Sequence, residues 1–179
     1  MDVLGAGVTL DRSVFSSNTA ISAGGGVVMS SASIDAVNTA FFGNTAPMGG
    51  ALAASSGDNT LSLLHCTLAG NTAPSGGAIY GVSDVAVAGS VLWNPAAPEE
   101  LHSCGSKGLD VSYSDVRGQQ GGSANLDADP KFVDLAGGDL HLQASSPCID
   151  AANPAGAPAT DLLGKPRAGV PDMGAYEYP

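Results

Sequence analysis

Apolar and polar residues alternate along several short stretches of this chain, and the stretches recur at a nearly constant distance. Residues 8–10 and 61–63 read apolar, polar, apolar, which is the pattern of a strand with one buried face. No window keeps the spacing of three or four residues that is typical of an amphipathic helix. With 25 Gly among 179 residues, a helical chain is further disfavoured. The pattern therefore predicts short strands joined by tight turns.

One phrase follows the alternating stretch three times. It reads Phe15-Ser-Ser-Asn18, Phe41-Phe-Gly-Asn44 and Leu68-Ala-Gly-Asn71, each followed by Thr-Ala. The three asparagines lie 26 and 27 residues apart, and a fourth, degenerate copy ends at Asn94, 23 residues later. A strand-rich repeat of this length is typical of one coil of a parallel β-helix. The sequence predicts an all-β parallel β-helix of about five to six coils with an irregular C-terminal cap.

Equivalent positions of the repeat should stack into ladders from coil to coil. We expect inward apolar ladders of three residues each: Val8, Ile34 and Leu61, then Leu10, Ala36 and Leu63, then Phe15, Phe41 and Leu68. Asn18, Asn44, Asn71 and Asn94 should lie at a turn, with amides bonded between coils. Glycine pairs at 25–26, 49–50 and 76–77 should supply positive φ at the next corner. We interpret these asparagines as structural, because a ligand-binding side chain is rarely repeated in every coil.

These motifs resemble known families. Phe-x-x-Asn with Gly-Gly-Ala-(Leu/Ile), over residues 8–94, resembles the repeat of polymorphic outer membrane proteins and of bacterial β-helix surface proteins with a pectate-lyase-like architecture. The strings at 129–134, 138–142, 146–150, 161–167 and 172–178 are similar to the terminal module of secreted β-helix proteins often described as choice-of-anchor proteins. The resemblance implies a bacterial secreted or cell-surface protein such as an adhesin. It also implies a right-handed solenoid, which agrees with the general preference for right-handed crossover connections.

The chain divides into two parts of one domain. Residues 1–128 should form the coils, with loop excursions near 94–108, where proline and acidic residues break the pattern, and 117–126, which are rich in Gly, Gln and Ser. Alternation returns at 109–116 and predicts a further coil strand. Residues 129–179 should form a closing module, with strands at 131–133 and 139–142 before an irregular, proline-rich segment.

Charge and hydropathy restrict the partners. Six basic residues against 17 acidic ones give a net charge of −11, which argues against nucleic acid and anionic membranes as partners. The sequence has no apolar stretch long enough to span a bilayer and no basic-plus-apolar leader after Met1. We expect an extracellular or cell-surface protein whose signal peptide and anchor are absent from this chain and whose upstream coils belong to a longer protein. Its expected partners are a polysaccharide or the surface of a host or neighbouring cell.

Candidate chemistry is sparse. Polysaccharide lyases on this fold need a base beside acidic residues that hold calcium. The basic residues are Arg12, Lys107, Arg117, Lys131, Lys165 and Arg167. Arg12 aligns with Asn38 and His65 in the repeat, the other bases fall in loops or in the closing module, and His65, His102 and His141 have no nucleophile motif beside them. We predict no catalytic residue and no cofactor.

The acidic residues towards the C-terminus allow two interpretations each. Asp127, Asp129, Asp134 and Asp139 lack a known calcium-loop spacing; we predict that they cap turns, with calcium as the alternative. Asp150, Asp161 and Asp172 with Arg167 should form a structural polar lock, with a catalytic carboxylate pair as the alternative. The three cysteines, Cys66, Cys104 and Cys148, leave one disulfide and one free thiol possible. They have no zinc-site spacing.

Two functions of different classes remain open. The first is a noncatalytic secreted or cell-surface scaffold that is adhesive or contacts carbohydrate. The second is the C-terminal fragment of a polysaccharide lyase or hydrolase whose catalytic coils lie upstream. An ice-binding surface fits less well, since Thr19, Thr45 and Thr72 give a single column. Because one fold serves both main functions, the upstream sequence would discriminate them: an acidic cluster with Lys or Arg favours the enzyme, and further degenerate repeats favour the scaffold.

Overall fold

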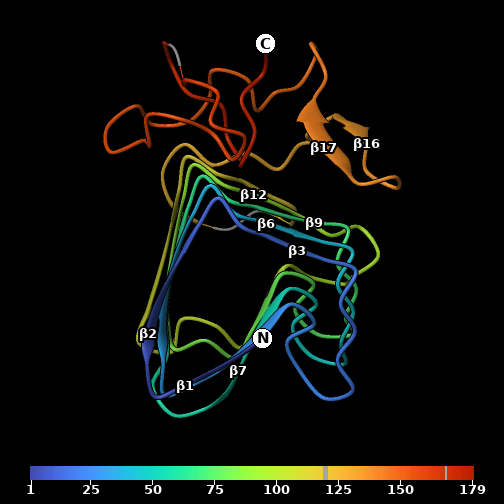
Figure 1. The fold of residues 1–179 in the computed structure, drawn as a ribbon, viewed down its shortest axis with the longest axis vertical. Coiled ribbons are helices and arrows are strands. Elements are labelled where there is room, and N and C mark those ends of the chain that lie inside the picture. The colour runs from blue at the N-terminus through green and yellow to red at the C-terminus, as the bar shows by residue number, and fades with distance from the viewer. Residues whose placement is uncertain (119–120, 168) are drawn as a thin grey trace.

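The computed structural model describes residues 1–118, 121–167 and 169–179. Its regular elements in these residues are β-strands, and residues 2–116 wind into a parallel β-solenoid with three sheets around one interior (Figure 1). Each sheet has five strands, so the predicted all-β parallel solenoid is confirmed. From the first strand of a sheet to the last, the chain makes about four turns.

Successive coils contribute one strand to each sheet. Sheet A contains β1 (Asp2–Leu4), β4 (Val27–Ser30), β7 (Leu52–Ser56), β10 (Ile79–Tyr80) and β13 (Leu101–His102). Sheet B contains β2 (Gly7–Asp11), β5 (Ser33–Val37), β8 (Thr60–Leu64), β11 (Asp84–Ala88) and β14 (Gly108–Ser112). Sheet C contains β3 (Val14–Ser16), β6 (Ala40–Phe42), β9 (Thr67–Ala69), β12 (Val91–Trp93) and β15 (Asp115–Val116).

The apolar ladders pair as the repeat alignment requires. Val8 pairs with Ile34 and Ile34 with Leu61, and the second and third ladders keep the same register. Phe41 is completely buried, and its ring stacks on Phe15 with centroids 4.9 Å apart. Burial of these inward columns gives the solenoid a continuous apolar core, which is the main stabilising term of such a fold.

The corner between sheets B and C is formed by residues in the left-handed region. Positive φ occurs at the same place in every coil, at Arg12, Asn38, His65, Gly89 and Tyr113. Their backbone amides each donate to a carbonyl one level further on. Arg12, Asn38 and His65 are equivalent positions of the repeat. They share the left-handed backbone conformation of the corner, while their side chains differ.

The predicted glycine pairs need a correction. The first glycine of each pair with positive φ is Gly24, Gly49 or Gly76, so the pair in the first repeat is 24–25 and not 25–26. The pairing of Val27 with Leu52 shows that Gly26 takes the place of an alanine in later coils. The second glycine is required for another reason than φ: a Cβ on Gly50 would lie 2.5 Å from the carbonyl oxygen of Gly77.

The segment after Asn94 returns to the solenoid sooner than expected. Residues 94–108 were predicted to leave the coil, yet β13 lies within them and pairs with β10. The predicted strand at 109–116 is divided between sheets B and C as β14 and β15. Of the predicted loop at 117–126, residues 119–120 lie outside the described residues, while Ser123 and Leu126 form parallel bridges with the last coil. These bridges extend the solenoid by part of another level.

The C-terminal module lies on the side of the solenoid. It begins with an antiparallel hairpin, β16 (Phe132–Asp134) and β17 (Asp139–Leu142), near the predicted strands, and continues as irregular chain. A second apolar cluster joins Ala40, Ala69 and Val91 of sheet C to module residues that include Phe132, Cys148 and Met173. Figure 1 shows the module above β3, β6, β9 and β12. The segment predicted as a C-terminal cap therefore packs against the outer face of sheet C.

Candidate functional site

The repeated asparagines form a continuous hydrogen-bond ladder inside the solenoid. The side-chain nitrogen of Asn44 donates to Oδ1 of Asn71 over 2.9 Å, and that of Asn71 to Oδ1 of Asn94 over 3.0 Å. The same oxygens accept the backbone amides of Asn44 and Asn71. The remaining amide hydrogens are used on the carbonyls of Phe15 and Phe41. Asn44, Asn71 and Asn94 are fully buried, so their polar groups are used within the protein.

The ladder ends on an ion pair between the buried Glu100 and the partly exposed Arg117, which the repeat did not reveal. Glu100 accepts the side-chain nitrogen of Asn94 at 2.5 Å and its backbone amide at 2.8 Å. Arg117 donates from Nε to the same carboxylate at 3.0 Å and from a terminal nitrogen to the carbonyl of Ala97. Burial raises the pKa of Glu100, although the bonds from Asn94 and Arg117 favour its ionised form. This pair takes the place of a fifth asparagine.

A second polar ladder runs one residue after the corner between sheets B and C. Ser13 donates its backbone amide to the hydroxyl of Thr39, Cys66 donates to Ser90, and Ser90 to Ser114. Asn125 ends this ladder by accepting the amide of Ser114 at 3.1 Å. The sequence signal was a column of small hydroxyl and thiol residues, which is visible only once the coils are in register. The column also explains why Cys66 is buried within a repeat.

The cysteines show no disulfide. Cys66, Cys104 and Cys148 are free thiols. Burial raises the pKa of Cys66 to about 12 and also raises the pKa values of Cys104 and Cys148. All three therefore stay protonated at neutral pH and pack as small, weakly polar side chains.

Arg167 connects the C-terminal module to the solenoid, with a different acidic partner from those expected. Its guanidinium forms an ion pair with Glu177 at 2.7 Å and donates to Oδ1 of Asn38 at 3.1 Å. It also donates to the carbonyls of Asp172 and Gly174. The side chains of Arg167 and Glu177 are 2% and 8% exposed, so this is a buried charge pair. The predicted carboxylate partners Asp150, Asp161 and Asp172 make no ion pair with Arg167 among the described residues.

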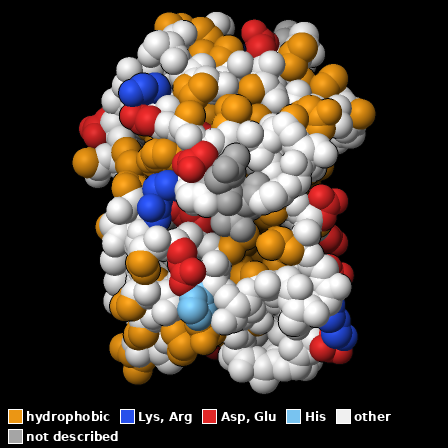
Figure 2. All heavy atoms as spheres, turned by 180° about the vertical axis from the view of Figure 1, so that it is seen from behind, with side chains coloured by type: hydrophobic (Ala, Val, Ile, Leu, Met, Phe, Trp, Pro, Cys, Tyr) orange, Lys and Arg blue, Asp and Glu red, His pale blue; other side chains and the backbone are white. Residues whose placement is uncertain are grey.

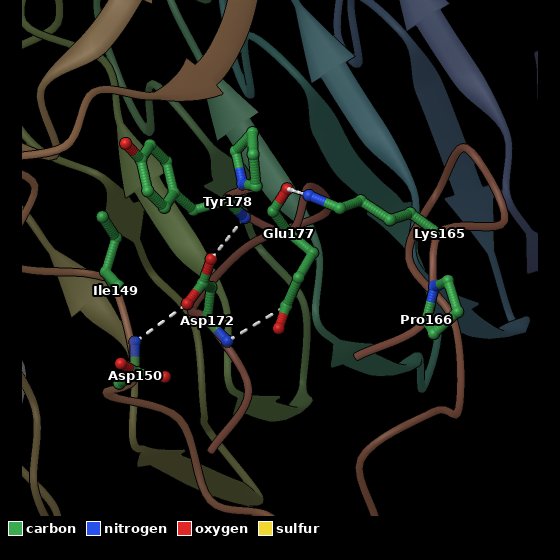
Figure 3. A pocket seen from close by; sticks show the side chains of 8 residues that line it. Ile149, Asp150, Lys165, Pro166, Asp172, Glu177 and Tyr178 are labelled. Atoms are coloured by element: carbon green, nitrogen blue, oxygen red, sulfur yellow. Dashed lines mark hydrogen bonds between the residues drawn. The ribbon is translucent and has the colours of Figure 1, made fainter. Parts of the chain in front are cut away.

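Two of the three expected lock residues, Asp161 and Asp172, hold the backbone instead. Asp172 accepts the amides of Asp150 and Tyr178 at 2.8 and 2.6 Å, and Asp161 accepts the amides of Leu163, Lys165 and Glu177. Figure 3 shows Asp172 between Asp150 and Tyr178 at the edge of a hollow of about 290 Å³. An irregular segment has few ladder bonds, and buried carboxylates that accept several amides take over that role.

Two titratable side chains are buried between the solenoid and the module. His65 contacts the carbonyl of Asp172 at 3.1 Å through Nδ1, and burial, with the charge of Arg167, lowers its pKa to about 4. Asp115 accepts the amide of Ala128 and the thiol of Cys148. Burial raises the pKa of Asp115 to about 6. The partner of His65 is a backbone carbonyl, and the Cys148 thiol beside Asp115 is protonated, because burial and the neighbouring carboxylate raise its pKa.

The basic residues are all engaged within the chain. Ion pairs join Arg12 to Asp11, Lys107 to Asp58, Arg117 to Glu100, Lys131 to Asp129 and Arg167 to Glu177, and Lys165 donates to the carbonyl of Glu177. On the face drawn in Figure 2, blue groups accordingly lie beside red ones. Asp129 and Asp134 cap turns by accepting nearby amides. In residues 1–118, 121–167 and 169–179, no group of three or more His, Cys, Asp or Glu side chains is placed to hold a metal ion.

A groove separates the β16–β17 hairpin from the edge of sheet C. It consists of two adjoining hollows of about 270 and 530 Å³, which share Ser17 and Phe42 in their linings. Tyr176 and Leu140 line the first hollow and Leu135 the second. We call this feature the hairpin groove. Nothing in the sequence indicated it, because it arises from the sideways position of the module.

The comparison with protein families matches part of the repeat region. The family model described as the Chlamydia polymorphic membrane protein (Chlamydia_PMP) repeat matches residues 65–82, which include β9, Asn71 and β10. No curated protein and no solved structure matches the chain. In the described residues, no helix has the length and apolar character of a membrane span.

Proposed function

We propose that this chain is a noncatalytic scaffold at the cell surface, in which a solenoid shaft carries a laterally attached module. The observation that carries the proposal is the asparagine ladder. The polar residues that the repeat places in successive coils are buried and bonded to one another, so the repeated feature maintains the shaft. A short match to a polymorphic membrane protein repeat supports the surface location.

The acid–base inventory supports a scaffold over a lyase. Lyase chemistry needs a base beside acidic residues that hold calcium. In the described residues no group of three or more His, Cys, Asp or Glu side chains is placed to hold a metal ion, and the guanidiniums of Arg117 and Arg167 are paired with Glu100 and Glu177. The net charge of −11 also repels the polyuronates on which such enzymes act.

Two measurements test the proposal. Antibodies against the purified chain should label intact source cells without permeabilisation, and labelling only after lysis would contradict the surface location. The purified chain, incubated with polygalacturonate or alginate, should release no unsaturated oligosaccharides detectable by ultraviolet absorbance. Their appearance, lost on heat denaturation, would favour the alternative of a polysaccharide-active enzyme.

A further inference from the structure

The hairpin groove has an uncharged lining in a strongly acidic protein. Among the described residues that line its two hollows, none is Lys, Arg, Asp, Glu or His, although the chain carries a net charge of −11. Because the two hollows share Ser17 and Phe42, the groove runs from Tyr176 past Phe42 to Leu135. Its shape and its lining therefore suit an extended, neutral ligand.

The aromatic floor of the groove is held in place by glycines from two separate elements. A Cβ on Gly138, in the hairpin, would lie 2.8 Å from the Phe42 ring, and a Cβ on Gly70, in the next coil, would lie 3.1 Å from it. A side chain at either position would displace the ring. The hairpin turn is itself fixed, because Gly137 donates to Asp134 and Gly138 to Leu135.

Polar groups surround this floor. Ser16 and Ser17 are exposed, and in the part of the chain that the structure describes their hydroxyls have no hydrogen-bond partner. The Tyr176 ring is half-buried against His141, with centroids 4.6 Å apart. The groove thus combines aromatic rings with available hydroxyl groups, which is the mixture of apolar surface and few polar groups that fixes the orientation of a small ligand.

We propose that the hairpin groove binds a neutral oligosaccharide. A sugar ring presents an apolar C–H face, which packs on Phe42 and Tyr176, and an equatorial rim of hydroxyls, which bonds with Ser16 and Ser17. An acidic glycan finds no cation in the groove, and the acidic protein repels it. The inference rests on the proposed scaffold function and assigns the scaffold a ligand class and a site.

The test measures binding of cellohexaose, xylohexaose, mannohexaose and chitohexaose by isothermal titration calorimetry, with hexagalacturonate as the acidic comparison. Ser16 pairs with Phe42 across β3 and β6, so Ser16→Trp should fill the groove. We expect at least one neutral hexasaccharide to bind, and Ser16→Trp and Phe42→Leu to weaken it by about ten-fold, the effect of about 1.4 kcal/mol. Ser33→Trp is the matched control, at an exposed strand position in sheet B, and should change affinity less than about two-fold.

Several outcomes would overturn the groove assignment. These are no binding of any neutral hexasaccharide, equal binding by Ser16→Trp and the unmodified chain, and tighter binding of hexagalacturonate. Thermal unfolding checks each variant, and Ser16→Trp, at an exposed position, keeps the test decisive if Phe42→Leu does not fold. None of these outcomes affects the scaffold proposal, whose cell-labelling and product-release assays are independent.

Discussion

At the scale of single residues, Asn71 shows how one side chain can satisfy two neighbouring coils. It donates to Asn94 and to the carbonyl of Phe41, and accepts two hydrogen bonds from Asn44. Replacing Asn71 by Ala leaves these buried groups without partners, and each such group costs about 1–3 kcal/mol. We expect Asn71→Ala to lower the free energy of unfolding by about 3 kcal/mol or more, as measured in urea.

The control for this substitution is in the same ladder. Asn18 is exposed, and its side chain donates to Asn44. Asn18→Ala should therefore lower the free energy of unfolding by about 1 kcal/mol or less. A similar loss in both variants would show that burial does not determine the strength of the ladder.

The two buried titratable groups predict opposite responses to pH. His65 has a folded pKa of about 4, below its ordinary value of 6.5, so its contribution to stability is present above the unfolded pKa and is lost as pH falls through about 4. Asp115 has a folded pKa of about 6, above its ordinary value of 3.8, so its contribution is present below the unfolded pKa and is lost as pH rises through about 6. Between these values the two effects largely cancel.

Asp115→Asn separates the two groups. Relative to the unmodified chain, this variant should lose about 3 kcal/mol of stability on acidification from pH 7 to pH 4, since one pKa unit corresponds to about 1.4 kcal/mol. Urea unfolding at several pH values measures the difference. A difference that stays constant with pH would show that Asp115 titrates normally.

At the scale of one coil, the second glycine of each pair lies close against the neighbouring coil. A Cβ on Gly50 would lie 2.5 Å from the Gly77 carbonyl and 3.0 Å from Asn71 Cβ. Because backbone of the next coil cannot move aside, Gly50→Ala should destabilise the chain by about 2–4 kcal/mol, the range of a strained core substitution. Gly121→Ala, where a Cβ meets nothing within 4 Å, should stay within about 0.5 kcal/mol. Guanidinium unfolding of both variants measures these changes, and an equal loss of stability in both would contradict the close approach at Gly50.

The same scale shows what the sequence could predict. The register of Phe15, Phe41 and Leu68 follows from a period of 26 or 27 residues, because side chains at equal positions of a solenoid must stack. The shift of the first glycine pair was missed, since three consecutive glycines at 24–26 give no signal of which one has positive φ. The hydroxyl column was missed because Ser, Thr and Cys look unrelated until their positions align.

At the scale of the whole molecule, the contacts between the module and the solenoid could not be predicted from the sequence. Arg167 was expected to hold the terminal module together, and an ionic hub there was predictable from the excess of nearby acids. Its bonds to Asn38, across 129 residues, and to Glu177 depend on the lateral docking of the module, for which no local pattern exists. The hairpin groove depends on the same docking and was equally invisible.

This docking makes Arg167 the side chain whose loss should matter most for the whole molecule. Arg167→Ala leaves the carboxylate of Glu177 buried without its cation and removes the bond to Asn38, and breaking a buried pair typically costs about 3–5 kcal/mol. Lys107→Ala is the control, because its ion pair with Asp58 is exposed on both sides and should contribute less than about 1 kcal/mol. We expect the melting temperature to fall clearly more for Arg167→Ala, and limited proteolysis to cut that variant first between residues 121 and 131, where the module leaves the solenoid. Equal, small effects of both substitutions would mean that the apolar contacts of Ala40, Ala69 and Val91 alone hold the module, and that the Arg167–Glu177 pair should be reconsidered as a binding site.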